Sequence, residues 1–153
     1  MKLAEALALR AETTRRVEQL RSRVVANARY QEGEEPAEDA AALLVEAGQA
    51  LDELESLIRR INRTNSAAVL REGGTLTDAL ARRDVLRLRH AVLSSAAEAA
   101  SGSNSYRQMR SELRMYAALP VAELRTRIDE LAKQIREVDV LVQRSNWEVD
   151  LLD

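Results

Sequence analysis

Apolar side chains recur every three or four residues in two long stretches of the chain, which is the spacing of one face of an α-helix. The first stretch runs from residue 44 to residue 65, and the second from residue 124 to residue 152. Such unbroken heptad spacing is typical of helices that pack along a coiled-coil-like seam. The two rows are Leu44, Ala47, Leu51, Leu54, Ile58, Ile61 and Asn65, and Leu124, Ile128, Leu131, Ile135, Val138, Val142, Ser145, Val149 and Leu152.

Gly and Pro residues that interrupt the helical spacing divide the chain into four predicted helices. A less regular apolar row indicates a helix over residues 2–28, and the turn signals Gly33 and Pro36 separate it from the second helix, which should start just after Pro36 with Glu38 and Asp39 in its first turn. A third helix is expected over residues 77–100, and Pro120 marks the start of a fourth over about residues 121–151. The predicted inward row of the third helix is Ala81, Val85, Leu88, Val92, Ala96 and Ala99.

A small β element is predicted beside the third helix. Residues 68–72 form a short β-capable run before the turn signal Gly73-Gly74, and residues 107–117 alternate charged with small or apolar side chains. We expect the second segment to be extended and to pair with residues 68–72 or with residues 75–76, with a helix over 107–117 as the alternative. The predicted fold class is mainly α: a bundle of four long helices with a small β element between helices two and three and before helix four.

Length and composition narrow the class of protein. The chain has 153 residues, of which 46% are hydrophobic and 31% are charged, and none is Cys. This length predicts a single helical-bundle domain over residues 1–153, and no apolar run is long enough to span a bilayer. The apolar stretch at the start is broken by Glu5 and ends at Arg10, too short for a signal peptide, so we expect a cytoplasmic protein.

The supply of catalytic side chains is poor. The single His is His90, and Arg87 stands three residues before it, so the Glu-x-x-His motifs of di-metal bundles are absent. The five Gly residues form no dinucleotide fingerprint and no Walker A loop. We therefore predict that the protein is not an enzyme and that it uses no cofactor.

Charge is segregated along the chain. Residues 1–30 carry seven basic and three acidic side chains, residues 31–58 carry nine acidic and no basic ones, and residues 59–95 carry eight basic and three acidic ones. This alternation predicts neighbouring helices of opposite charge rather than one basic face for nucleic acid. The arginines at the end of the second helix and in the third are accordingly expected to form salt bridges with the acidic segment rather than to contact phosphate.

Two groups of polar residues are candidate sites. Asn65 occupies a seam position where an apolar residue is expected, and an Asn there needs a hydrogen-bonded partner. It could join a buried polar network or a small ligand-binding site made of Asn62, Asn65, Arg83, Asp84 and Glu112, with Asn146 as a further member. The acidic turn supplies weaker metal-ligand candidates, Glu32, Glu34 and Glu35, although it lacks the ligand spacing of a calcium loop.

Five segments, taken in order, resemble the septicolysin-like family of small bacterial proteins. They are residues 27–36 (NARYQEGEEP), 61–65 (INRTN), 75–84 (TLTDALARRD), 110–113 (RSEL) and 146–147 (NW). The resemblance implies a cytoplasmic helical protein of bacteria whose activity is not established, and it assigns no catalytic residue. The family name suggests a cytolysin, but the seams suit protein packing better than contact with a bilayer.

The leading hypothesis is a non-enzymatic helical bundle that self-associates through its heptad rows and acts as a scaffold or interaction module. A homo-oligomer is expected, without nucleic acid or membrane partners. One alternative is a protein that binds a small ligand or a divalent cation at the polar cluster. The other alternative, a membrane-active cytolysin, rests on the family name alone.

Overall fold

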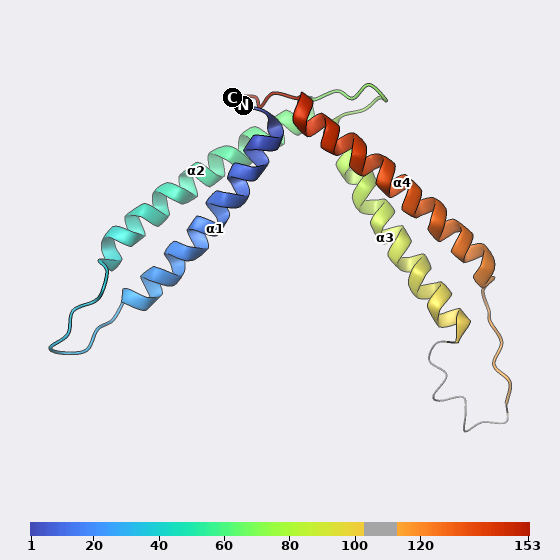
Figure 1. Cartoon of the computed structure of the whole chain (residues 1–153), viewed down its shortest axis with the longest axis horizontal. Helices are drawn as coiled ribbons and strands as arrows, with labels where there is room; N and C mark the ends of the chain where they lie inside the picture. The colour runs from blue at the N-terminus through green and yellow to red at the C-terminus, as the bar shows by residue number, and fades with distance from the viewer. Residues whose placement is uncertain (103–112) are drawn as a thin grey trace. The chain divides into compact units, whose positions relative to one another are not determined.

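All four predicted helices are present in the computed structural model, which describes residues 1–102 and 113–153. They are α1 (Leu3–Asn27), α2 (Ala40–Ala67), α3 (Leu76–Ser101) and α4 (Val121–Glu148) (Figure 1). The prediction of a mainly α protein is confirmed. None of the helices in the described ranges is long and apolar enough to cross a membrane.

The chain is organised in two compact units. Unit 1 comprises Met1–Thr75 and Ser145–Asp153, and unit 2 comprises Leu76–Arg144. In unit 1, α1 lies antiparallel to α2, and in unit 2, α3 lies antiparallel to α4 (Figure 1). Each unit is therefore a helical hairpin, in which each long helix lies beside one other long helix of the same unit.

The core of unit 1 lies along the line of contact between α1 and α2. Leu20 of α1 and Leu43 and Ala50 of α2 are buried together, and Val17, Val24 and Ala47 pack around them. The inward row of α2 consists of Leu43, Ala50, Leu57, Ile61 and Thr64.

The predicted seam of α2 is only half correct. Ile61 is buried and Leu54 half-buried, but Leu44, Leu51 and Ile58 are 59%, 50% and 38% exposed. α2 carries two adjacent apolar rows, one containing residues 43 and 57 and the other containing residues 44 and 58. A single neighbouring helix covers only one of the two rows, so the other faces outward.

The start of α2 also differs from the prediction. The helix begins at Ala40 rather than directly after Pro36, and Asp39 is its N-cap instead of a residue of the first turn. The Asp39 Oδ1 accepts hydrogen bonds from the backbone N–H groups of Ala41 (2.9 Å) and Ala42 (3.2 Å). These two donors have no partner inside the helix, which explains why it starts here.

The predicted β element is wrong for the described residues. Residues 69 and 75 form one isolated antiparallel bridge, and 113–117 form no strand. Gly73 and Gly74 adopt positive φ values of 97° and 76°, which return the chain so sharply that one bridge forms before α3 begins at Leu76. The rest of the segment expected to pair, residues 107–112, lies outside the described ranges.

Within α4 the predicted row is confirmed, whereas the predicted row of α3 is wrong. The last two residues of the α4 row, Val149 and Leu152, lie beyond the end of the helix at Glu148, and Leu152 is 42% exposed. Leu124, Val138 and Val142 of α4 are buried. The buried residues of α3 are Leu76, Ala79, Leu86 and Ala97, and not the expected row. Of that expected row, Val85, Leu88 and Val92 are 48%, 66% and 68% exposed. Apolar residues stand on two faces of α3, and the helix turns the face containing Leu86 toward α4.

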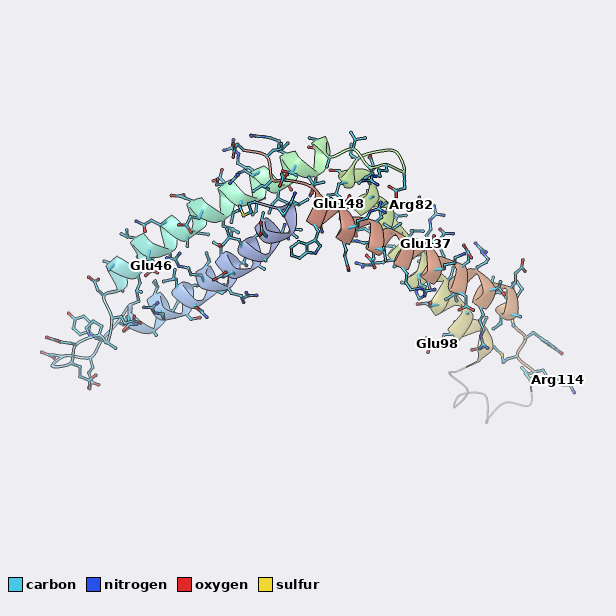
Figure 2. The ribbon with its side chains drawn as sticks, turned by 45° about the horizontal axis from the view of Figure 1, so that its top comes forward. Glu46, Arg82, Glu98, Arg114, Glu137 and Glu148 are labelled. Carbon is cyan, nitrogen blue, oxygen red and sulfur yellow. The ribbon has the colours of Figure 1, made fainter. Side chains whose placement is uncertain are left out.

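Charged side chains cover much of the remaining helix surface. Figure 2 shows Arg82 of α3 and Glu137 of α4 extending from their helices, and both are exposed. The exposed apolar row of α3 is therefore set among charged neighbours.

Candidate functional site

An apolar groove lies between α3 and α4 on one edge of unit 2. Its volume is about 480 Å³. Both helices contribute to its lining, which consists of Val85, Leu88, Arg89, Val92, Leu93, Arg127, Glu130, Leu131 and Gln134. Because Leu93 and Leu131 are half-buried while Leu88 and Val92 are largely exposed, the groove runs from the contact between the helices out to the free face of α3.

The rim of the groove carries charges of both signs. Within the part of the chain that the structure describes, neither Arg89 nor Arg127 forms an ion pair. Glu130 accepts one hydrogen bond, from the side chain of Gln134 at 3.4 Å. These rim charges are available to a binding partner.

The other edge of unit 2 is closed by ion pairs. The Arg87 Nη2 atom donates to both carboxylate oxygens of Asp139, at 3.0 and 3.1 Å. Arg83 lies 4.0 Å from the same carboxylate and 3.3 Å from Asp84. Charge-assisted contacts thus join α3 to α4 on this edge, whereas apolar side chains are exposed on the groove edge.

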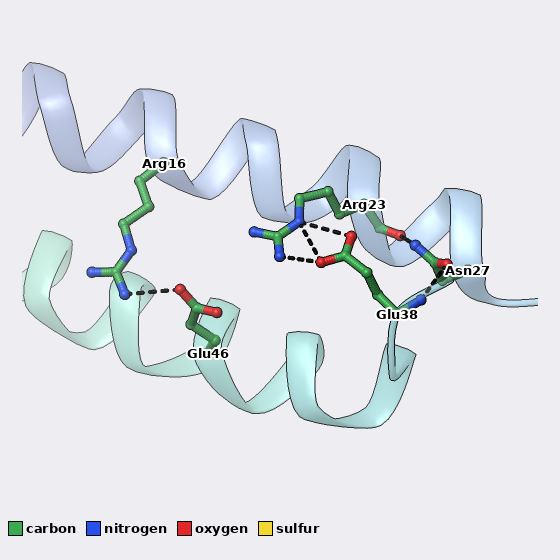
Figure 3. A network of polar contacts seen from close by, with 5 residues as sticks. All are labelled: Arg16, Arg23, Asn27, Glu38 and Glu46. Atoms are coloured by element: carbon green, nitrogen blue, oxygen red, sulfur yellow. Dashed lines mark hydrogen bonds and ion pairs between the residues drawn. The ribbon is translucent and has the colours of Figure 1, made fainter. Parts of the chain in front are cut away.

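Unit 1 has a comparable polar edge (Figure 3). Arg16 of α1 lies 3.1 Å from Glu46 and 3.7 Å from Glu53 of α2. Arg23 binds the carboxylate of Glu38, with Nε 3.0 and 3.1 Å from its two oxygens. The basic first helix therefore pairs with the acidic second segment, as the charge pattern predicted. The prediction that arginines of the third helix also pair with that segment is wrong for Arg83 and Arg87, which pair with Asp84 and Asp139 instead.

The contact between Arg23 and Glu38 changes the titration of both groups. The hydrogen bond from Arg23 lowers the pKa of Glu38 below its ordinary value, and the same bond raises the pKa of Arg23. Asn27 supports the contact, because its Oδ1 accepts from the backbone N–H of Glu38 at 3.0 Å. Its Nδ2 donates to the carbonyl of Arg23 at 2.8 Å, so Asn27 joins both members of the pair.

Residues 149–153 are fixed against the helices of unit 1. Leu3 donates its backbone N–H to the carbonyl of Val149 at 3.0 Å, and Leu151 donates to the carbonyl of Met1 at 2.9 Å. Lys2 forms an ion pair with Asp150 at 2.9 Å, and this contact lowers the pKa of the Asp150 carboxyl. These contacts tie the segment to the start of α1.

Thr64 joins the same segment to α2. Its side chain is buried, and its Oγ1 donates to the carbonyl of Arg60 at 2.8 Å and accepts from the backbone N–H of Leu152 at 3.0 Å. Arg60 also donates to the carbonyl of Leu152, at 3.0 Å. Sequence reasoning missed Thr64, although it lies three residues after buried Ile61, at the spacing of one helix face.

The structure places the predicted polar cluster in both units. Asn62 is exposed and Asn65 half-buried, both on α2 of unit 1, whereas Arg83 and Asp84 belong to unit 2. Of these residues, it brings together the side chains of Arg83 and Asp84, as part of the ion-paired edge. Glu112 lies outside the described residues. A ligand site made of these side chains stays a prediction.

The acidic candidates lie in the connection between α1 and α2. Glu32, Glu34 and Glu35 are exposed there, and the backbone N–H of Glu34 donates to the carbonyl of Gln31 at 3.0 Å. Among the described residues, no group of three or more His, Cys, Asp or Glu side chains is placed to hold a metal ion. The apolar groove is therefore the better-defined candidate site.

Comparison with known proteins assigns a family. The model of a family of unknown function, DUF6847, matches residues 10–151. The chain belongs to DUF6847. A solved relative of this DUF6847 chain is a functionally unknown conserved protein from Corynebacterium diphtheriae, which is 40% identical, with a TM-score of 0.92 and 99% of each chain covered. No curated protein matches the chain.

The resemblance to a septicolysin-like family is wrong, since the family model and the solved relative both point elsewhere. Two of the segments that suggested it form a turn or begin a helix, and residues 61–65 and 146–147 lie within α2 and α4. The helix start at residues 75–84 and the turn at residues 27–36 serve local backbone needs that many helical proteins share. Such segments carry little information about family.

Proposed function

We propose that this DUF6847 chain is a non-enzymatic helical protein that self-associates and acts as a scaffold or interaction module. The observation that carries the proposal is the groove edge of unit 2, where Val85, Leu88 and Val92 are 48% to 68% exposed. Contiguous exposed apolar side chains rimmed by polar groups are typical of protein-binding surfaces. We propose a cytoplasmic location, without nucleic acid or membrane partners, on the composition of the chain alone.

The exposed row of unit 1 supports the same proposal. Leu44, Leu51 and Ile58 recur every seven residues along α2 and remain 38% to 59% exposed. Seven-residue spacing keeps side chains on one stripe of a helix, which a further helix can cover. Both hairpins thus present an apolar row that their own two helices leave uncovered.

The proposal of a non-enzymatic role rests on the residues available. The chain has no Cys and one His, and His90 is half-buried with its Nδ1 3.5 Å from the Ser94 hydroxyl in the same helix. The groove is lined by aliphatic side chains, two arginines, one Glu and one Gln, without a nucleophile paired with a base. Binding is the chemistry that such a surface supports best.

Sedimentation velocity from about 1 to about 100 μM tests the proposal, because association depends on protein concentration. The wild-type chain is expected to sediment as a dimer or larger species at the upper end of this range. Leu88→Arg places a charge in the apolar row, so the dissociation constant for self-association of this variant should be at least about 100-fold larger than that of the wild type.

The matched control is Val140→Arg. Val140 is 66% exposed on α4 and does not line the groove, so this variant should associate like the wild type. A wild-type chain that remains monomeric throughout the range contradicts self-association. Equal weakening by both arginines would show that added charge, and not the groove, determines association.

A further inference from the structure

We infer that the groove of unit 2 binds the same groove of a second copy, with the two α3 helices packed antiparallel and Leu88 beside the two-fold axis. This inference rests on the proposed self-association and specifies its surface and geometry. Three observations support it: the order of side chains along α3, the charges on the groove rim and the location of the ion pairs.

Between Ala81 and Ala96, the outward row of α3 has the same order of residue types in both directions. This part of the row consists of Ala81, Val85, Leu88, Val92 and the half-buried Ala96, with the largest side chain at the centre and alanines at the ends, and Ala99 continues it by one further alanine. A two-fold axis perpendicular to α3 reverses the direction of the second helix. Antiparallel packing about Leu88 therefore places Val85 near Val92 of the second copy, and alanine near alanine.

The rim charges favour a second copy over an acidic or a basic partner. A uniformly acidic helix would meet Glu130, and a uniformly basic one would meet Arg89 and Arg127. A second copy brings both signs, so the Glu130 carboxylate of each copy has Arg89 and Arg127 of the other available across the axis. Opposite charges across an interface fix its register and disfavour other partners.

The ion pairs of unit 2 leave this edge open for packing. Arg83 and Arg87 hold Asp139 on the other edge of the hairpin, so forming the groove contact breaks neither of these pairs. Packing the groove edges of two hairpins together would cover Val85, Leu88 and Val92 and give each α3 helix a second helical neighbour.

Site-specific disulfide formation tests the geometry, because the natural chain contains no Cys. Leu88→Cys should give a disulfide-linked dimer under mild oxidation, since residue 88 of each copy faces its own equivalent. A mixture of Val85→Cys and Val92→Cys should cross-link at least about 10-fold more than either variant alone at equal total concentration. Sedimentation of each variant under reducing conditions checks that it still associates.

The control is Val140→Cys, which places an equally exposed thiol on α4 outside the groove and should cross-link only at the rate of random collision. If the wild type is monomeric, the proposed function itself fails. If the wild type associates but Leu88→Cys cross-links no faster than Val140→Cys, the groove contact alone is overturned. Preferential cross-linking of Leu88→Cys with Leu51→Cys would show instead that α2 of a second copy occupies the groove.

Discussion

Thr64 shows how a single hydroxyl connects two segments of unit 1, α2 and residues 149–153. It is 1% exposed, donates to Arg60 within α2 and accepts from Leu152, so both hydrogen-bonding roles of the hydroxyl are used in a site without water access. Replacing it by the isosteric Val removes both bonds and leaves the Leu152 N–H without its acceptor.

We expect Thr64→Val to lower the free energy of unfolding by about 1 to 3 kcal/mol, measured by urea denaturation. The control is Thr14→Val, because Thr14 also donates its hydroxyl to a helix carbonyl, that of Arg10 at 2.8 Å, but is exposed. Thr14→Val should change stability by less than about 0.5 kcal/mol. A Thr64→Val variant as stable as the wild type would contradict the role assigned to this hydroxyl.

Glu38 gives the stability of unit 1 a pH dependence of known sign. Its pKa is lowered in the folded chain by the hydrogen bond from Arg23, so its contribution is complete above the unfolded-state pKa and is lost as the pH falls through the folded-state pKa. Urea midpoints of the wild type and Glu38→Gln should therefore differ at about pH 6 and converge toward about pH 2. A constant difference across this range would exclude the carboxylate as its cause.

At the scale of the element, α3 has two apolar faces of which one is buried in unit 2. Leu86 is 8% exposed and Leu88 is 66% exposed, although the two leucines are two residues apart. Leu86→Ala should lower the free energy of unfolding by about 2 to 4 kcal/mol, because it leaves a cavity against α4. Leu88→Ala should lower it by less than about 0.5 kcal/mol when measured at a concentration where the chain is monomeric.

The contrast between these two variants tests the orientation of α3 directly. Equal losses of stability would mean that both faces are covered within one chain. A larger loss of unfolding free energy for Leu88→Ala than for Leu86→Ala would mean that the row predicted from the sequence, and not the row of Leu86, faces α4.

The same element shows how far periodicity predicts the fold. The existence and approximate limits of the helices follow from apolar spacing and from Pro and Gly, and the row of α4 is predicted correctly because its other faces are strongly charged. The face of α3 is not predicted, since Leu86 and Leu88 belong to apolar rows of similar quality. The difference depends on which row meets α4, where Asp139 also receives Arg83 and Arg87.

The candidate site could be predicted only in part. The heptad row on α2 was expected to mediate self-association; three of its residues, Leu44, Leu51 and Ile58, are exposed, and association through them stays a prediction. The groove of unit 2 was not predicted, because its exposed residues were assigned to the core. A groove depends on how two helices lie together, and one helix's periodicity does not contain that information.

At the scale of the whole molecule, the proposed self-association predicts that thermal stability depends on protein concentration. Binding of the folded chain to a second folded chain stabilises both, so the wild-type Tm should rise by several degrees over a 100-fold increase in protein concentration. The Tm of Leu88→Arg should change less over the same range, and differential scanning calorimetry measures both. An identical concentration dependence for the two proteins would mean that the groove is not the contact surface.

The segment 149–153 has a consequence for the exchange of amide hydrogens with solvent. The N–H groups of Leu151 and Leu152 lie outside every helix, yet they donate hydrogen bonds to the carbonyl of Met1 and the hydroxyl of Thr64. The backbone N–H of Leu3 in turn donates to the carbonyl of Val149. Exchange requires these bonds to open, and opening them detaches the segment from both α1 and α2. In deuterium oxide, Leu151 and Leu152 should therefore exchange with the slow kinetics of interior helix amides, although secondary structure alone would assign them to a fraying end.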